Sequence, residues 1–185
     1  MANKNILALD ASTKRTGYAL ISEGEYHYGA IVATSTKLEK RLITMRDKIK
    51  ELVKEYNIDT IVIEDVRPDT NTDNNKNDNF HKNAHTARVL TWLQGVIAVG
   101  AYEENPNIVF EMMGASSWRS KVHIQKYCIK RDNQKQMDIE YANKCGFPLK
   151  APLTAAQDDE ADAIGIFMAY CSSIKTPTNE KESAF

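Results

Sequence analysis

Residues 6–21 decide the fold at the start of the chain, and they read ILALDASTKRTGYALI. The first four residues are apolar, which predicts a short buried strand that ends at Asp10. Two further strand-like stretches, 16–21 and 26–32, flank a turn sequence of Ser, Glu, Gly and Glu. This pattern predicts a hairpin that continues from the first strand, so that three antiparallel strands open the chain.

The rest of the chain alternates between helix and strand patterns. Apolar residues between Leu38 and Tyr56 recur at steps of three and four, which predicts an amphipathic helix. Thr60 to Ile63 is β-branched throughout and predicts a central strand. Further on, the patterns predict a helix over 84–102, a strand over 107–112, a short helix around Trp118 capped by Ser116 or Ser117, a helix from Asp132 to near Gly146, and a helix over 157–171. This succession of strands and helices predicts a single α/β domain over residues 1–171.

Two segments do not fit this alternation. Residues 68–83 are rich in Asn and Asp and poor in apolar residues, so we expect a mobile loop there. Residues 172–185 follow the last predicted helix and are expected to form a flexible C-terminal tail.

The composition predicts a protein that works inside the cell. The sequence has no run of about 18 apolar residues, so no membrane-spanning helix is expected. The polar residues before Ile6 do not resemble a secretory signal. Cys128, Cys145 and Cys171 show no CxxC spacing, and we interpret them as reduced thiols. We therefore expect a cytoplasmic location.

The distribution of charge is more informative than its sum. A net charge of -1 argues mildly against a nucleic-acid-binding protein, because such proteins usually carry a basic excess. Between Trp118 and Gln136, however, basic residues dominate, and the one acidic residue is Asp132. The basic residues of this segment are Arg119, Lys121, Lys126, Lys130, Arg131 and Lys135. We therefore expect this segment to form a surface that faces DNA.

Four acidic residues occur in apolar surroundings, where a charge is costly. Asp10 and Glu64 each follow a predicted buried strand, and Asp159 and Asp162 lie three residues apart on one face of the last helix. Such carboxylates must be paired, protonated or bound to a metal, and Mg²⁺ and Mn²⁺ prefer oxygen ligands. Two ions about 4 Å apart can hold the attacking water and the leaving oxygen of a phosphodiester.

Each of these acidic residues also has a purely structural interpretation. An acid at a strand end is commonly a turn or cap residue, and acids in the first turn of a helix interact favourably with its dipole. Asp158 lies four residues before Asp162 and competes with Asp159 for a ligand role. The joint occurrence of the four acids in this order, more than any single position, indicates a metal-dependent nuclease.

In three motifs the sequence resembles RuvC-type Holliday junction resolvases, particularly the bacteriophage members, within the RNase H-like superfamily. The motifs are residues 6–19, residues 61–66 (IVIEDV) and residues 159–164 (DEADAI). The resemblance implies an RNase H-like fold, with a five-stranded mixed sheet flanked by helices on both faces. It also implies a homodimer that cuts two opposed strands of a four-way DNA junction with Mg²⁺ or Mn²⁺, in the cytoplasm of a bacterium or a phage-infected host.

Carried over to this sequence, the family's metal ligands are Asp10, Glu64, Asp159 and Asp162, which would hold two ions per site. Cleavage would leave 5′-phosphate and 3′-hydroxyl ends. Lys121 and Lys135 fall where the family keeps basic residues near the scissile phosphate. The residues predicted to contact DNA are Arg15, Arg67, Phe80, Lys82, Arg119, Lys121, Lys126, Lys130, Arg131 and Lys135.

The chain departs from the family pattern after its second motif. The family has an aromatic residue there that helps to open the junction, whereas this chain has Arg67 and Pro68. Phe80 is either a replacement wedge that stacks on an unpaired base or an anchor for the next helix. His81 and His85 have the spacing of a metal pair but no third ligand close by in the sequence.

Two other functions remain open from the sequence. Residues 10–17 also resemble the phosphate loop of sugar kinases and actin-like ATPases, although those proteins have two such domains. A non-catalytic protein that recognises branched DNA is the second alternative. The helix predicted over 84–102 is either a dimer seam or a helix packed only on the sheet.

Overall fold

A five-stranded sheet with the strand order β3-β2-β1-β4-β5 lies at the centre of the chain. The structure, a computed structural model, describes residues 4–65, 77–122, 139–147 and 157–175. Its elements are β1 (Ile6–Asp10), β2 (Arg15–Ser22), β3 (Glu25–Val32), α1 (Leu38–Glu55), β4 (Thr60–Asp65), α2 (Asn77–Glu104), β5 (Val109–Gly114), α3 (Ala115–Lys121) and α5 (Asp158–Lys175), with a short helical stretch at 139–144. The predicted element order and the mixed sheet are confirmed.

The first three strands form the predicted antiparallel hairpins. Ser22 pairs with Glu25, so the β2–β3 turn has two residues, Glu23 and Gly24, with φ angles of 53° and 86°. Positive φ at both positions is the geometry of a type I′ turn, whose twist matches that of the strands. In the β1–β2 turn, the buried Thr16 hydroxyl donates to the Ser12 carbonyl oxygen at 2.7 Å. The sequence of both turns therefore fixes the register of this half of the sheet.

The other half of the sheet is parallel, and it aligns the ends of β1 and β4. Strand β1 pairs in parallel with β4, with Leu9 opposite Ile63, and β4 pairs in parallel with β5. Asp10 and Glu64 each come one position after this last pair. Because successive side chains of a strand alternate between faces, Asp10 shares a face with Ile6 and Ala8, and Glu64 shares that face with Val62.

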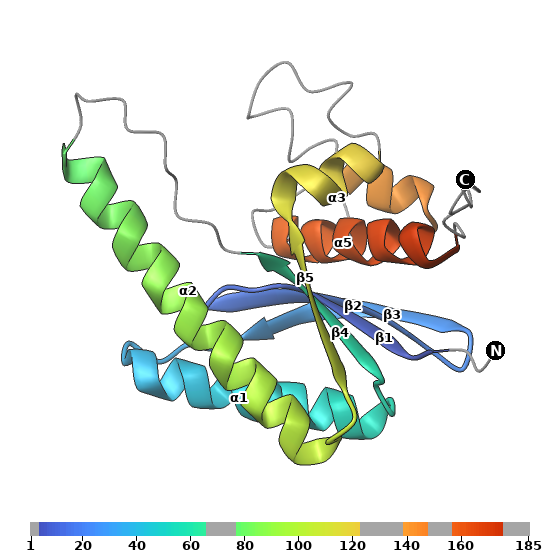
Figure 1. The fold of residues 1–185 in the computed structure, drawn as a ribbon, viewed down its shortest axis with the longest axis horizontal. Coiled ribbons are helices and arrows are strands. Elements are labelled where there is room, and N and C mark those ends of the chain that lie inside the picture. Colours follow the sequence, from blue (N-terminus) through green and yellow to red (C-terminus); the bar gives the residue numbers. More distant parts are fainter. Residues whose placement is uncertain (1–3, 66–76, 123–138, 148–156, 176–185) are drawn as a thin grey trace, which may run out of the picture.

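Helices cover both faces of the sheet (Figure 1). Helices α1 and α2 lie on one face, where they enclose a core that includes Leu7, Leu9, Leu20, Ile61, Ile63, Met45, Ile49, Leu93 and Ile97. Helices α3 and α5 lie on the opposite face, over a core that includes Ile6, Ala8, Ala19, Val62, Trp118, Ile164 and Phe167. Asp10 and Glu64 therefore belong to the face that α3 and α5 cover.

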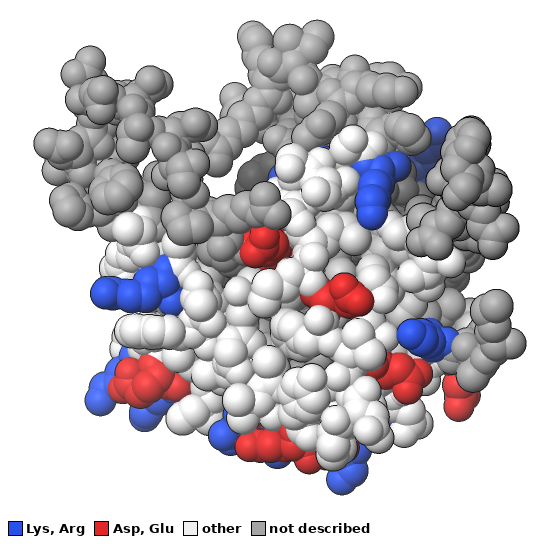
Figure 2. Space-filling view, viewed as in Figure 1, with Lys and Arg blue, Asp and Glu red and all other residues white. Residues whose placement is uncertain are grey.

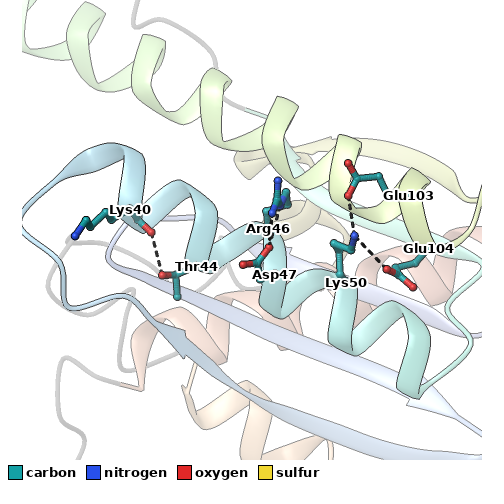
Figure 3. A network of polar contacts seen from close by, with 7 residues as sticks. All are labelled: Lys40, Thr44, Arg46, Asp47, Lys50, Glu103 and Glu104. Atoms are coloured by element: carbon teal, nitrogen blue, oxygen red, sulfur yellow. Dashed lines mark hydrogen bonds and ion pairs between the residues drawn. The ribbon is translucent and has the colours of Figure 1, made fainter.

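Helices α1 and α2 pack against each other in the C-terminal half of α2 (Figure 1). A Cβ at Gly100 of α2 would lie 2.6 Å from the Arg46 Cγ, so only glycine allows this approach. At the end of the contact, the Lys50 ammonium forms ion pairs with Glu103 at 2.8 Å and Glu104 at 3.2 Å (Figure 3). Such surface pairs each contribute little stability. They link the C-terminal end of α2 to α1, while the hydrogen bond from Gln94 connects α2 to the end of β4.

Gly17 allows α5 to lie directly on the sheet. It pairs with Asp10 across β1 and β2, and a Cβ at Gly17 would lie 1.8 Å from the Asp159 carbonyl oxygen. No side chain fits into that distance, so the backbone of α5 contacts the backbone of β2. This contact sets the position of Asp159 and Asp162 relative to the strand ends.

The helix ends differ from the sequence prediction at two places near DNA-binding candidates. Helix α2 begins at Asn77, inside the predicted loop over 68–83, because Asn and Asp suit the first turn of a helix whose later turns are packed. Helix α3 has Gly114 as its N-cap with no side-chain capping bond. The predicted cap at Ser116 or Ser117 is therefore wrong, since both residues lie inside the helix.

The C-terminal helix is longer than predicted. Helix α5 continues to Lys175, past the predicted end at 171. The Ser172 and Ser173 hydroxyls donate to the carbonyl oxygens of Met168 and Ala169, which lets two polar residues continue the helix. Within the described ranges, no helix combines the length and apolarity needed to cross a bilayer.

Replacing Gly17 with alanine should displace the start of α5 and destabilise the protein. Overpacking of this kind typically costs about 1–3 kcal/mol, and each kcal/mol lowers the Tm of a domain of this size by roughly 2–4 °C. Thermal unfolding followed by circular dichroism measures the effect. Lys14→Ala, an exposed residue in the adjoining turn, is the control and should leave Tm unchanged. An unchanged Tm for Gly17→Ala would contradict the contact between α5 and β2.

Candidate active site

Asp10 and Glu64 form the sheet side of the candidate site. Both side chains are half-buried at the carboxyl ends of β1 and β4, on the face covered by α3 and α5. Gln94 of α2, which is buried on the other face, donates from Nε2 to the Glu64 carbonyl oxygen at 2.8 Å. The backbone at the end of β4 is therefore fixed by a helix on the opposite face.

Helix α5 brings the two remaining acids to the same edge, and arginines hold both of them. The Arg15 Nε lies 3.2 Å from Asp159 Oδ2, and its Nη2 lies 2.8 Å from Glu160 Oε1. The Arg119 Nη2 lies 3.2 Å from Asp162 Oδ2. One arginine from β2 and one from α3 thus restrain the first turns of α5, as expected for partly buried carboxylates.

Trp118 of α3 also belongs to the site, which the sequence did not indicate. It is fully buried, and its indole Nε1 donates to Glu64 Oε2 at 2.9 Å. The Arg119 guanidinium lies 4.3 Å from the centre of the same ring. A buried indole N–H needs an acceptor, so a buried tryptophan in a chain with several acids in apolar surroundings is the signal that could have pointed to this contact.

The electrostatics show that the four acids share one environment. Burial raises the pKa of Asp10 well above its ordinary value, and repulsion from Asp162, Glu64 and Asp159 raises it further, against the opposing charge of Arg119. Burial also raises the pKa of Glu64, opposed by the Trp118 hydrogen bond and by Arg119. Ionised carboxylates in this arrangement repel one another and favour the binding of cations.

Comparison with known proteins identifies the family. The sequence profile described as crossover junction endodeoxyribonuclease RuvC matches residues 6–117, more than half of the chain. The chain belongs to the RuvC family. No curated protein sequence matches the chain.

Solved RuvC structures share the fold. RuvC of T. thermophilus in complex with a Holliday junction substrate aligns with a TM-score of 0.65 and 12% identity, over 95% of this chain and 98% of that chain. A second Thermus thermophilus RuvC structure gives a TM-score of 0.62 and 12% identity, over 94% and 97% of the two chains. The RNase H-like fold predicted from the sequence is therefore confirmed.

Membership of the RuvC family establishes the activity class. The protein is a nuclease that resolves Holliday junctions, as the resemblance of its motifs predicted. RuvC-family enzymes depend on a divalent metal. The two alternatives left open by the sequence, a kinase-like phosphotransferase and a non-catalytic binding protein, do not belong to this activity class.

The donor chemistry at the candidate site fits a divalent cation. Four carboxylates supply only hard oxygen donors, and burial together with the charges of the other three acids raises the pKa of Asp10. Within the described residues, no three His, Cys, Asp or Glu side chains already form a compact ligand set. The hydrogen bonds and ion pairs from Trp118, Arg119 and Arg15 occupy carboxylate oxygens instead.

The predicted basic residues fall into two groups. Arg119 lies at the carboxylates, whereas the Lys121 ammonium is directed away from them and donates to the Ser173 hydroxyl at 2.6 Å. Arg15 is engaged with α5. Phe80 and Lys82 lie in the first turns of α2, where only the backbone is described. The predictions for Arg67, Lys126, Lys130, Arg131, Lys135 and the helix cap Asp132 lie outside the described residues.

The described surface shows no continuous basic patch on the face drawn in Figure 2, where acidic and basic side chains are scattered among uncharged ones. Most of the predicted basic segment lies between 123 and 138, which is not described. The DNA-facing surface stays a prediction.

Asp10→Asn should stabilise the metal-free protein, increasingly so as the pH rises. Because the folded state raises the pKa of Asp10, it binds this proton more tightly than the unfolded chain does. The free energy of unfolding of the wild type therefore falls as pH rises from about 4 toward the folded pKa of Asp10. Asparagine does not ionise, so the Asp10→Asn protein does not lose this stability. Urea unfolding in EDTA at about pH 5 and about pH 8 measures the difference. Asp47→Asn, on the exposed face of α1, controls for removal of a carboxylate. A stability difference that does not change with pH would contradict the charge penalty at Asp10.

Proposed function

We propose that Asp10, Glu64, Asp159 and Asp162 are the catalytic carboxylates with which this RuvC-family enzyme cleaves four-way DNA junctions. The observation that carries this proposal is the environment of Asp10, whose pKa is raised by burial and raised further by the charges of the other three acids. The residues come from β1, β4 and α5, elements far apart in sequence. Such convergence of buried like charges is typical of a functional site rather than of turn or cap residues.

The four carboxylates would hold Mg²⁺ or Mn²⁺, and we propose two ions per site. When bound, divalent ions provide Lewis-acid chemistry that activates a water and stabilises the departing 3′-oxygen of a phosphodiester. The chain's own contribution is to hold the carboxylates at one edge of the sheet. Gly17 sets the position of α5, and Gln94 fixes the end of β4. Products with 5′-phosphate and 3′-hydroxyl ends are expected.

Cationic side chains of the chain would balance negative charge during the reaction. Arg119 faces Asp162, and its charge acts on Asp10 and Glu64. It is therefore placed to compensate charge that develops on a phosphate at this site. Lys135 and Lys121 stay predictions for the same role, and Lys121 would have to leave Ser173 to reach the carboxylates.

Substitution of each acid tests the proposed site. Asp10→Asn, Glu64→Gln, Asp159→Asn and Asp162→Asn should each slow cleavage of a synthetic four-way junction by more than the roughly 10- to 100-fold typical of outer-shell changes. Junction binding, measured by gel shift in Ca²⁺, should be nearly intact, because DNA contacts come mainly from basic residues. Forks and flaps assayed beside the junction define the substrate range.

Two variants sharpen this experiment. Asp47→Asn on α1 is the matched control and should cut at the wild-type rate. Asp158→Asn distinguishes the two neighbouring acids, and we expect it to retain cleavage because Asp159 is the one that acts on Asp10. Retained cleavage in Glu64→Gln or Asp159→Asn would contradict the assignment of that residue.

We also propose that the enzyme is a homodimer joined along α2. One face of this helix is buried in the core through Leu93, Ile97 and Ala101. The opposite face carries an exposed stripe, which we call the α2 stripe: Trp92, Gly95, Val99 and Tyr102. The steps of three, four and three along this stripe are those of a helix–helix seam. A second copy fits best, because a two-fold dimer would match the two-fold symmetry of a junction.

A charge on the α2 stripe should separate the dimer. Val99 is 56% exposed at the middle of the stripe, so Val99→Glu should leave the fold intact and give a monomer in analytical ultracentrifugation. Ile43→Glu on α1 is the matched control, since Ile43 is 50% exposed outside the stripe. A wild-type monomer, or a Val99→Glu protein that stays dimeric, would contradict the proposed seam.

A further inference from the structure

Glu64 accepts hydrogen bonds from residues on both faces of the sheet. Gln94 of α2 binds its carbonyl oxygen at 2.8 Å from one face, and Trp118 of α3 binds its carboxylate Oε2 at 2.9 Å from the other. Both donors are buried, with 7% of Gln94 and none of Trp118 exposed. A glutamate has three rotatable side-chain bonds, so an acid used for catalysis needs such fixing to stay in one position.

Trp118 is itself unable to move. A Cβ at Gly165 of α5 would lie 2.4 Å from the indole ring, so the ring fills the space above that glycine. Its other surroundings include the Arg119 guanidinium at 4.3 Å from the ring centre, and Arg119 in turn pairs with Asp162 at 3.2 Å. The indole N–H is a donor with a single direction, and its direction is fixed by packing. One short helix thus contacts an acid from β4 and an acid from α5.

We propose that Trp118 is a positioning residue for Glu64, and that Gln94 supports it from the opposite face. The proposal rests on the catalytic role of Glu64 given above. Trp118 is fully buried and acts through Glu64: its bond to Oε2 fixes the side-chain rotamer, so that Oε1 would be the oxygen offered to a cation. Loss of the indole N–H should therefore lower the rate of cleavage and raise the Mg²⁺ concentration needed, with no effect on junction affinity.

Trp118→Phe removes the N–H and keeps an aromatic ring in the same space. Under single-turnover conditions we expect cleavage to slow by roughly 10- to 100-fold, with an unchanged junction Kd in Ca²⁺ and a similar Tm. Gln94→Met removes the second donor, and it should also slow cleavage while leaving the junction Kd unchanged. Tyr26→Phe is the matched control, since it removes one donor from an aromatic residue packed on Phe147 and Phe167, and it should cut at the wild-type rate.

Nuclear magnetic resonance provides a readout that does not depend on activity. The chain has two tryptophans, so two indole N–H signals are expected, and Trp92 serves as the internal reference. In the metal-free protein the Trp118 N–H should exchange slowly with solvent, and Glu64→Ala should shift its resonance while that of Trp92 stays in place. Addition of Mg²⁺ alone should shift the Trp118 signal in the wild type and not in Glu64→Ala.

The outcomes separate this proposal from the proposed site. If Glu64→Gln retains cleavage, the catalytic role of Glu64 is wrong. If Glu64→Gln is inactive while Trp118→Phe cuts at the wild-type rate at every Mg²⁺ concentration, the positioning role alone is overturned. A Trp118→Phe protein whose lower rate is accompanied by a lower Tm and a weaker junction Kd would also overturn it, because packing would then explain the loss.

Discussion

The contact between Gly17 and the Asp159 carbonyl oxygen is the constraint on which the site depends. Helices normally lie on sheets with a layer of side chains between them, and here one missing Cβ removes that layer. The backbone of α5 therefore meets β2 next to Asp10, which is the partner of Gly17 in the sheet. Two acids from a helix and two from strand ends are brought to one edge by a single glycine, with Arg15 holding the helix end in place.

Gathering four acids in a partly buried place carries an electrostatic cost, and the chain compensates part of it with its own donors. Arg15 and Arg119 each pair with one acid of α5, and Trp118 supplies a neutral donor to Glu64. Burial, and after it the charges of Asp162, Glu64 and Asp159, still keep the pKa of Asp10 raised. This balance keeps the site folded before any cation is bound and leaves enough negative charge to attract one.

Local sequence patterns predicted the elements of this fold and pointed to the four acids that the fold brings to one edge of the sheet. The apolar strand before Asp10, the β-branched strand before Glu64 and the spacing of Asp159 and Asp162 are local signals. The contacts that hold these acids are not local. Trp118 and Glu64 are 54 residues apart, and Arg15 and Glu160 are 145 residues apart. Periodicity shows that a tryptophan is buried, but the acceptor of its N–H is set by how α3, α5 and the sheet pack together.

Helix α2 contacts the candidate active site with one face and carries the proposed dimer seam on another. Gln94 touches the backbone of Glu64 on one side of the helix, and Trp92, two residues away, begins the α2 stripe on the other. In a dimer joined along the α2 stripe, the paired α2 helices would set the distance between the two active sites. A slip of the seam by one seven-residue repeat would shift one protomer along the other by about 10 Å. In the proposed dimer, the register of the seam along α2 would therefore decide how far apart the two opposed DNA strands are cut.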